Sequence, residues 1–256
     1  MSKTRPIEIL PVLHIPEIRP GDNLARILVA AAKKSKLTFR QHDILVLAQK
    51  IISKSENRLI DLTTIAPSQR AIDLADASAT DRRKDPRLIE IILRESRRIV
   101  REHPVLIVET HHGFVCANAG VDQSNIPGEN IVSLLPVDPD ASAKRIAQAL
   151  RKLKRKTIAV IISDTFGRPW RLGLTNIAIG VYGIAPMQDL RGSRDANRKP
   201  LHASIIATAD ELAAAAGLAM PKSAAIPAVI IRNFAHSSSN ARAITIVRPA
   251  EDDLFR

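Results

Sequence analysis

Apolar and polar positions follow one another along the chain in blocks that predict helices and strands in turn. Short apolar runs bounded by turn residues predict buried strands, because a strand covered on both faces has no polar side. Blocks with apolar residues at helical spacing predict amphipathic helices. The expected strands are 7–13, 44–48, 104–110, 157–163 and 228–232, and the expected helices are 24–33, 69–77, 87–100, 143–156 and 209–219. This pattern favours an α/β protein of mixed α+β character.

Capping residues predict where two of these helices begin. Asp22 or Asn23 can accept a backbone hydrogen bond at the start of helix 24–33. Asp85 can do the same before the next long helix, and Pro86 then stands at the first helical position, where its missing N–H costs nothing.

Two segments lack any regular pattern. Segment 111–130 is polar, contains glycine and has no convincing periodicity. Segment 164–173 follows directly on the buried strand 157–163, and we expect it to be a loop. No repeat or low-complexity linker divides the chain. We therefore expect one unit over residues 1–256, with room for two structural subdomains whose boundary the sequence does not place.

The composition indicates an aliphatic core without disulfides. The chain has 256 residues, of which 45% are apolar and only seven are Phe, Trp or Tyr. So few aromatic side chains weaken any prediction of base stacking, on which RNA and single-strand binders rely. The single cysteine, Cys116, excludes an internal disulfide and a thiolate zinc cluster, and we expect it to be a small buried apolar residue.

No segment is expected to enter a membrane. No apolar run reaches the roughly 18 residues that a spanning helix needs. The first ten residues are basic but have no apolar stretch of the kind found in secretory signals. We expect a cytoplasmic protein.

The chain carries a large positive charge that is concentrated in one helix. It has 38 Lys and Arg against 26 Asp and Glu, which gives a formal net charge of +12. Residues 143–156 hold seven basic residues and no acid, with apolar residues at helical spacing on the other side. Such a face can meet nucleic acid or an acidic partner, although charge runs mostly face water. We expect a solvated surface.

Asp164 is the first candidate for chemistry. It follows the buried strand 157–163, and ligands collect at the carboxyl ends of strands in α/β proteins. Its carboxylate and the hydroxyl of Thr165 suit a hard cation such as Mg²⁺. Arg168 and Arg171 can hold phosphate or carboxylate oxygens bidentately. The alternative is that Asp164 caps a turn and the arginines pair with surface acids.

A second candidate lies within the polar segment 111–130. Asp122, Ser124 and Asn125 offer oxygen ligands and amide donors next to small residues that let a ligand approach the backbone. The alternative is an Asx turn that satisfies only its own loop. The adjacent His111 and His112 lack metal-ligand spacing. The sequence has no Walker-type phosphate loop and no G-x-G-x-x-G motif.

Several segments resemble the coenzyme F420 glutamyl ligase family. The motifs IPEIRPGD, GFVCANAGVDQSN, LLPVDPDAS, SDTFGRPWR and AIGVYGIAP occur in the family's order and spacing, and the resemblance runs from about residue 15 to 232. It implies a two-domain fold and an intertwined homodimer. It also implies a GTP-dependent ligase that joins L-glutamate to the phospholactyl carboxylate of coenzyme F420-0 through an acyl phosphate, with possible further γ-linked additions. The implied cofactors are Mg²⁺ or Mn²⁺, helped by K⁺.

The resemblance also implies roles for individual residues. Asp122 and Asp164 match metal-binding aspartates, and Thr165 matches a ligand of a second metal ion. Asp122, Asp164 and Lys54 are thus the expected catalytic residues, and Arg168 and Arg171 are candidates for anionic substrate groups. The expected nucleotide-binding residues are Ile15, Pro16, Glu17, Ile18, Gln49, Lys50, Lys54, Asn125, Met220, Pro221, Lys222, Ser223, Ala224, Ala225, Ile226 and Pro227.

The sequence departs from the family pattern beside these residues. Leu174 and Asn176 stand where the family usually has an amide and a carboxylate, so two polar contacts are missing. Lys222 stands where some members supply a metal-binding amide, and an ammonium group cannot ligate a cation. Pro221 and Ala225 replace glycines. The pattern indicates a divergent member.

Four functions stay open at this point. The leading one is a GTP- and metal-dependent glutamate ligase acting on F420-0. The same chemistry on another acidic acceptor, of pterin or furan type, is the second. A nucleic-acid-binding protein and a non-catalytic relative are the others, and nucleic acid is not the expected partner because the basic run 143–156 lies outside the matched motifs.

Overall fold

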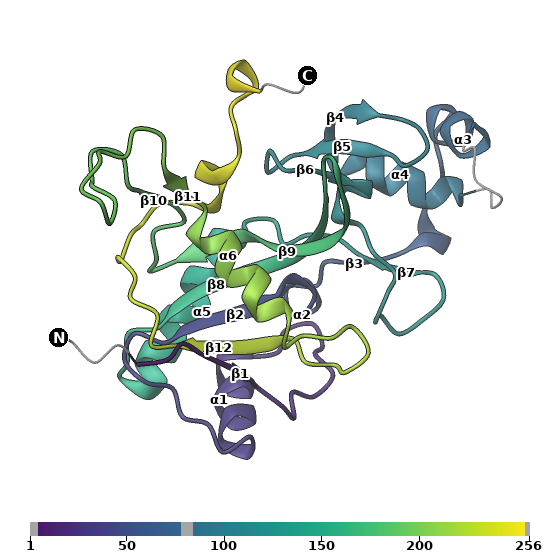
Figure 1. The fold of residues 1–256 in the computed structure, drawn as a ribbon. Coiled ribbons are helices and arrows are strands. Elements are labelled where there is room, and N and C mark those ends of the chain that lie inside the picture. The colour runs from purple at the N-terminus through teal and green to yellow at the C-terminus, as the bar shows by residue number, and fades with distance from the viewer. Residues whose placement is uncertain (1–4, 78–83, 254–256) are drawn as a thin grey trace.

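A five-stranded sheet forms the centre of the molecule (Figure 1). The computed structural model describes residues 5–77 and 84–253. Within the sheet β2 and β8 are parallel neighbours, and the other neighbouring strands are antiparallel. In spatial order the strands are β1 (Glu8–Pro11), β12 (Ala228–Arg232), β2 (Ile44–Ala48), β8 (Ala159–Arg168) and β9 (Arg171–Tyr182).

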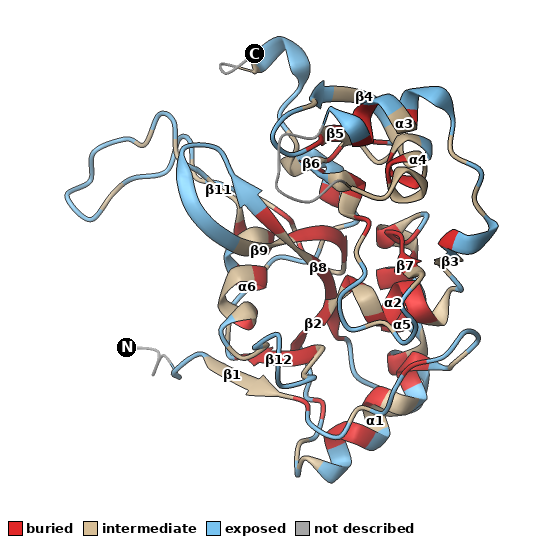
Figure 2. Cartoon of the chain, turned by 90° about the vertical axis from the view of Figure 1, so that its right-hand side faces the viewer, coloured by how far each residue is buried: buried red, intermediate tan, exposed pale blue. Residues whose placement is uncertain are grey.

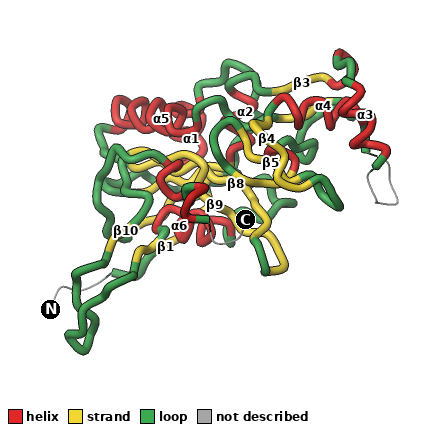
Figure 3. Tube along the Cα trace, turned by 90° about the horizontal axis from the view of Figure 1, so that it is seen from above, coloured by secondary structure: helices red, strands yellow, loops and turns green. Residues whose placement is uncertain are grey.

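Helices cover both faces of this sheet. α1 (Leu24–Lys34) and α5 (Pro139–Lys154) lie side by side on one face, and α6 (Thr208–Gly217) lies on the other (Figures 1 and 3). The strand β2 is therefore apolar along its whole length, and it contributes four fully buried side chains to the core. The short helix α2 (Gln49–Ser55) begins directly where β2 ends.

A second hydrophobic core lies beside the sheet. It contains Ile89, Ile91 and Ile92 from one helix together with Leu106 and Val108, all of them buried (Figure 2). The elements around it are β3 (Leu59–Asp61), η1 (Leu62–Thr64), α3 (Gln69–Asp76), α4 (Pro86–Arg94), β4 (Ser96–Arg101), β5 (Ile107–Thr110), β6 (Val115–Ala117), η2 (Asn118–Gly120) and β7 (Ile131–Ser133). The remaining elements are β10 (Gln188–Asp189), β11 (Ile205–Ile206), η3 (Ala243–Ile246) and η4 (Ala250–Asp252).

A buried ion pair fastens β12 to the start of β2. Arg232 donates from Nε and Nη2 to the two carboxylate oxygens of Asp43, each at 2.9 Å. Asp43 is 1% exposed, and Arg232 donates a further hydrogen bond to the carbonyl of Thr38. Because both charges are paired and hydrogen-bonded, their burial is tolerated, and the two parallel bonds fix the orientation of the guanidinium group.

Most of the elements expected from the sequence are present, and the mixed α/β class is confirmed. The strand 44–48 has the expected bounds, and helix 24–33 is longer by one residue. Asn23 caps that helix through a bond to the backbone N–H of Arg26, and Asp85 caps α4 with Pro86 in its first turn. The basic helix begins at Pro139 and ends at Lys154, two residues before the expected end.

The expected helix 87–100 is wrong in its second half. The helix ends at Arg94, and residues Ser96–Arg101 form β4, which pairs with β5. Ile99 and Val100 are β-branched, and strand pairing here outweighs the helical spacing of the apolar residues.

The expected loop 164–173 is also wrong. β8 continues to Arg168 and turns through Pro169 and Trp170 into β9, so these residues form a long hairpin. Trp170 has a φ of 56°, which lets the chain reverse tightly. Polar and glycine residues can lie in strands here because the outer half of the hairpin is exposed.

None of the helices in residues 5–77 and 84–253 has the length and apolar character that crossing a membrane requires.

Candidate functional site

A cavity of about 950 Å³ lies at the carboxyl end of β2. The neighbouring strand β8 runs parallel there, with Ala48 opposite Ser163, so Asp164 lies just past the end of β2. In α/β sheets this edge is the usual place for a ligand. Five separate parts of the chain form the wall, namely 15–18, 48–54, 117–127, the β8–β9 hairpin and 217–227.

The short helix α2 carries two lysines into this cavity. Lys50 and Lys54 are four residues apart and therefore lie on the same side of the helix. In the same helix Ser53 donates to the side-chain oxygen of Gln49 at 2.7 Å, and both side chains are buried. This bond satisfies two buried polar side chains within α2, and the two lysines line the cavity.

Lys54 is a largely buried cation that joins three parts of the wall. Its side chain is 8% exposed, and Nζ donates to a carboxylate oxygen of Glu17 at 2.5 Å and to the carbonyl of Asn125 at 2.8 Å. Because an unpaired buried ammonium group is costly, these contacts fix both the N-terminal turn and the 122–127 loop against α2.

Lys50 is bound to the second candidate segment. Its Nζ donates to a carboxylate oxygen of Asp122 at 2.5 Å and to the hydroxyl of Ser124 at 2.9 Å. The backbone N–H of Ser124 donates to the other oxygen of Asp122 at 2.8 Å, so the Asx turn considered as an alternative is present. The same turn also lines the cavity, so its presence is compatible with the predicted role of these residues as ligands. Lys50 and the hydrogen bonds from Ser124 lower the pKa of Asp122 against the opposing effect of its burial.

The negative charge of Asp164 is only partly stabilised by its surroundings. Burial raises its pKa to about 6, and the negative charge of Asp122 adds to this effect. The backbone N–H of Thr165 and the positive charges of Lys50 and Lys222 act in the opposite direction without restoring the ordinary value. Two carboxylates and two ammonium groups therefore act on one another across this cavity.

The hairpin side of the wall is held by a polar contact between its two strands, and it packs against α6. The hydroxyl of Thr165 donates to the side-chain oxygen of Asn176 at 3.0 Å. The amide nitrogen of Asn176 lies 3.0 Å from the point where a Cβ at position 217 would stand, so Gly217 leaves room for it.

Most of the residues expected from the sequence meet in this cavity. Ser223, Ala224, Arg168 and Arg171 do not line it, and the two arginines lie at the exposed end of the β8–β9 hairpin. Those that do line it are Ile15, Pro16, Glu17, Ile18, Gln49, Lys50, Lys54, Asp122, Asn125, Asp164, Thr165, Met220, Pro221, Lys222, Ala225, Ile226 and Pro227.

Sequence reasoning missed Asn118 and Gly217 as parts of the wall. The side-chain oxygen of Asn118 is buried and has no hydrogen-bond partner. Asn118 and Ala119 both have positive φ values, which turn the chain sharply into the cavity. Positive φ at an asparagine followed by alanine leaves no reliable mark in a single sequence, although Asn is the residue most tolerant of it.

The single cysteine has the inert character expected of it. Cys116 is buried, and its burial together with the charge of Asp164 raises the pKa of the thiol to about 12. His111 and His112 contact the backbone carbonyls of Arg94 and Pro136. Across the described parts of the chain, no group of three or more His, Cys, Asp and Glu side chains is placed to hold a metal ion.

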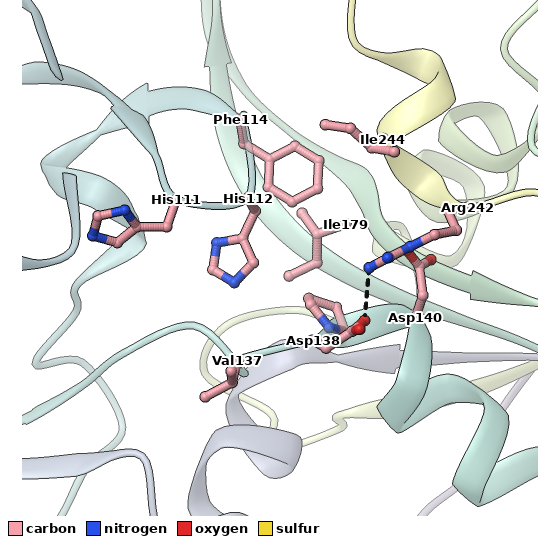
Figure 4. Close-up of a pocket in the computed structure, with 10 residues that line it drawn as sticks. His111, His112, Phe114, Val137, Asp138, Asp140, Ile179, Arg242 and Ile244 are labelled. Atoms are coloured by element: carbon pink, nitrogen blue, oxygen red, sulfur yellow. Dashed lines mark hydrogen bonds and ion pairs between the residues drawn. The ribbon is translucent and has the colours of Figure 1, made fainter. Parts of the chain in front are cut away.

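A second, smaller cavity of about 310 Å³ lies between the strand β6 region and the start of α5 (Figure 4). His112 stacks on Phe114 at a ring distance of 5.9 Å. On the opposite side Arg242 bonds both Asp138 and Asp140, so the charges here are already paired. Because Arg242, Asp138 and Asp140 pair with one another, we assign them a structural role and not a ligand-binding one.

The chain matches the model of the family described as F420-0:gamma-glutamyl ligase over residues 12–233. The chain belongs to this family. Every residue that lines the larger cavity lies within the matched stretch.

Relatives in this family are similar over their full length. The chain is 41% identical to the coenzyme F420:L-glutamate ligase of Methanothermobacter thermautotrophicus, with 98% of this chain and 99% of the relative covered. It is 38% identical to the protein of the same name from Methanocaldococcus jannaschii, with 100% and 99% covered. It is 40% identical to that from Methanopyrus kandleri, with 98% of each covered.

Proposed function

We propose that this chain is a ligase that forms an amide between L-glutamate and coenzyme F420-0, using GTP and a divalent metal ion. One observation carries the proposal: the cavity that gathers Lys50, Lys54, Asp122 and Asp164 is built entirely from the stretch that matches the F420-0:gamma-glutamyl ligase family. The relatives named coenzyme F420:L-glutamate ligase align over nearly the whole chain, which supports the same substrates here.

The proposed reaction has two balanced steps. A carboxylate oxygen of the acceptor attacks the γ-phosphorus of GTP, and the bond from the γ-phosphorus to the bridging oxygen of the β-phosphate breaks. GDP leaves, and the acceptor now carries an acyl phosphate. The amine of glutamate then attacks the acyl carbon, the amide forms, and phosphate leaves with the bonding electrons while the amine loses a proton. Transfers of this kind depend mainly on positioning and on neutralising charge.

The oxygen donors of the site fit a divalent metal ion. Asp122, Asp164 and the hydroxyl of Thr165 are hard ligands, and Mg²⁺ typically takes one or two carboxylates and completes its shell with phosphate oxygens and water. Burial raises the pKa of the Asp164 carboxyl to about 6, and among the described residues no Lys or Arg forms an ion pair with it. When bound there, the ion would neutralise phosphate charge and hold the γ-phosphate for attack.

The lysines of the cavity supply fixed positive charge toward the same ligands. Lys50 and Lys54 come from one helix, and Lys222 comes from the loop that follows α6. Such an arrangement holds phosphates without a glycine-rich loop, which this chain lacks. We also propose that K⁺ assists the reaction, and we assign no residue to its binding.

We also propose that the protein acts as a homodimer. The outer half of the β8–β9 hairpin exposes Trp170, Leu172 and Leu174, which are 74%, 99% and 61% exposed. Large apolar side chains gathered on one projecting element are typical of a surface that another protein covers. Light scattering on the purified protein tests this proposal, and a monomer at micromolar concentration contradicts it.

The reaction itself is tested by mass spectrometry. Purified protein with F420-0, L-glutamate, GTP and Mn²⁺ is expected to yield a product heavier by one glutamyl unit, together with GDP. The product should be absent when GTP or glutamate is left out. GTP turnover without any glutamyl product on F420-0 contradicts the proposed acceptor.

A second acceptor class has one observation in its favour. Leu174 and Asn176 line the cavity where the family usually has an amide and a carboxylate, so the wall offers fewer polar groups to an acceptor. The same assay with an acidic pterin or furan cofactor separates the two. Glutamylation of such a compound but not of F420-0 would keep the ligase chemistry and change the substrate.

Replacing Lys54 by Met is expected to weaken GTP binding about tenfold or more, which corresponds to about 1.4 kcal/mol, because the variant loses a fixed positive charge that faces the phosphates. The substitution removes a charge from the cavity and releases Glu17 and the carbonyl of Asn125. Titration calorimetry with GTP and Mn²⁺ measures the effect. The matched control is Lys156→Met, an exposed lysine far from the cavity, and equal affinities of the two variants would refute the role of Lys54.

A further inference from the structure

The excess positive charge of the protein is confined to two segments of the chain. Segments 24–42 and 141–163 together hold twelve Lys and Arg residues and no Asp or Glu. Because the net charge is +12, the rest of the chain has equal numbers of basic and acidic residues. Only one of these segments was notable from the sequence, as the basic run 143–156.

The fold brings the two segments together on one surface. Segment 24–42 contains α1 and segment 141–163 contains most of α5, and these helices pack against each other on one face of the sheet (Figure 3). Each helix leads into one of the two parallel strands, β2 and β8, so both basic C-terminal ends lie at the same edge of the sheet. We call the Lys and Arg side chains of these segments the α1–α5 surface.

Two hydrogen bonds join the chain segments that follow α1 and α5. The N–H of His42 donates to the carbonyl of Thr157 at 2.9 Å, and the N–H of Thr157 donates to the side chain of Gln41 at 2.9 Å. Arg40 and Lys156 are direct neighbours of these bonded residues in the chain. The cations that follow α5 are therefore continuous with those that follow α1.

Nearly all side chains of the α1–α5 surface are exposed to solvent. Eleven of the twelve belong to exposed residues, and Lys154 is intermediate. Arg145 pairs with Glu56, and the described parts of the chain show no ion pair for the others. Cations in the last turn of a helix interact favourably with the helix dipole, which explains one or two of them at the end of α1 and of α5. It does not explain the absence of every acid from both segments.

The α1–α5 surface lies away from the larger cavity. The cavity is at the carboxyl ends of β2 and β8, whereas Arg40 and Lys156 precede the amino ends of the same strands. The positive charge of this surface is therefore not part of the binding site for the small anionic substrates. A partner could occupy it without blocking the cavity.

We propose that the α1–α5 surface binds the phosphate backbone of nucleic acid without regard to sequence. A dense field of cations without acids matches a polymer that carries one negative charge on every phosphate. No Phe, Trp or Tyr is exposed on it, so bases have no stacking platform and sequence is not read. Leu153 is its only large exposed apolar side chain, which gives a membrane little to insert.

The test uses the full-length protein and a fluorescent 20-base-pair DNA duplex, with binding measured by anisotropy at several salt concentrations. Binding is expected to weaken about a hundredfold between about 50 and 200 mM salt, as expected for roughly four phosphate contacts. A variant with Lys33, Lys34, Arg151 and Lys152 all changed to Gln should bind at least about tenfold more weakly and show a smaller salt slope. Thermal unfolding of the variant checks that it is folded.

The matched control changes Arg191, Arg194, Arg198 and Lys199 to Gln, which removes four exposed charges outside the α1–α5 surface. It should keep most of the affinity. If both variants lose the same DNA affinity, binding depends only on the net charge of the protein and not on the α1–α5 surface, and that result overturns the proposal. Absence of binding at the lowest salt also overturns it, as does binding to phosphatidylserine vesicles without binding to the duplex, which would assign the surface to membranes.

Discussion

Replacing Asp164 by Asn is expected to abolish most of the ligase activity and, without metal, to make the folded protein more stable. The loss of activity should be about a hundredfold or more, since the variant loses one carboxylate ligand for the proposed metal ion and the charge that fixes it. The gain in stability has a separate cause, which is the cost of keeping this carboxylate ionised in a buried site.

The sign of the stability change follows from the pKa. The pKa of Asp164 is raised from 3.8 to about 6 on folding, so the ionised form is disfavoured in the folded state. This penalty is absent below about pH 4, grows as the pH rises, and is complete above about pH 6. At pH 7.5 its removal should stabilise the variant by up to about 3 kcal/mol, since one pKa unit corresponds to about 1.36 kcal/mol and the shift already includes the attraction to Lys50 and Lys222.

Thermal unfolding in the presence of EDTA measures this effect. The melting temperature of Asp164→Asn should exceed that of the unchanged protein at pH 7.5, and the difference should shrink toward pH 4. Adding GTP and Mn²⁺ should then reverse the order, because only the unchanged protein gains binding energy from them. A variant that is less stable than the unchanged protein at pH 7.5 in EDTA contradicts this account of Asp164.

Replacing Gly180 by Ala is expected to destabilise the fold by about 3 kcal/mol, at the upper end for overpacked positions. A Cβ at position 180 in β9 would stand 2.5 Å from the backbone carbonyl carbon of Pro139, at the start of α5. Backbone cannot move aside as a flexible side chain can, so the helix must shift from the sheet. A change of this size lowers the melting temperature by about 6–12 °C in a protein of this length.

A second glycine of the same hairpin serves as the control. A Cβ at position 167 in β8 would meet only one side-chain atom within 4 Å, at 3.9 Å on Leu174, and the φ of Gly167 is not positive. Gly167→Ala should therefore change the melting temperature little. Similar losses in both variants would mean that the hairpin itself, and not the approach of α5, is sensitive to added volume.

The parts of the fold that follow from local pattern could be predicted from the sequence. Asn23 and Asp85 cap the helices that follow them, and the apolar run Ile44–Ala48 is a buried strand. The β8–β9 hairpin could not be predicted, because its outer half is exposed and its tight turn depends on the positive φ of Trp170. The strand Ser96–Arg101 was missed because its pairing with β5 is a tertiary effect.

The candidate site also has parts that the sequence predicts and parts that depend on the tertiary fold. Asp122 and Asp164 stood out by residue type and by resemblance, and both line the cavity. The bonds that join Lys54 to Glu17 and to Asn125 connect residues 37 and 71 positions away, and no local pattern contains that information. The separation of Arg168 and Arg171 from the cavity follows from the length of the hairpin, which was not predicted.

The pairing of β1 with β12 has a consequence for how the protein is made. Glu8 lies opposite Arg232, so β1 can pair only after β12 has been synthesised, more than two hundred residues later. Segment 15–18 follows β1 and segment 217–227 precedes β12, and both are walls of the cavity. A nascent chain therefore cannot complete its ligand site until almost all of it has left the ribosome, and the two ends meet as a late, non-local step of folding.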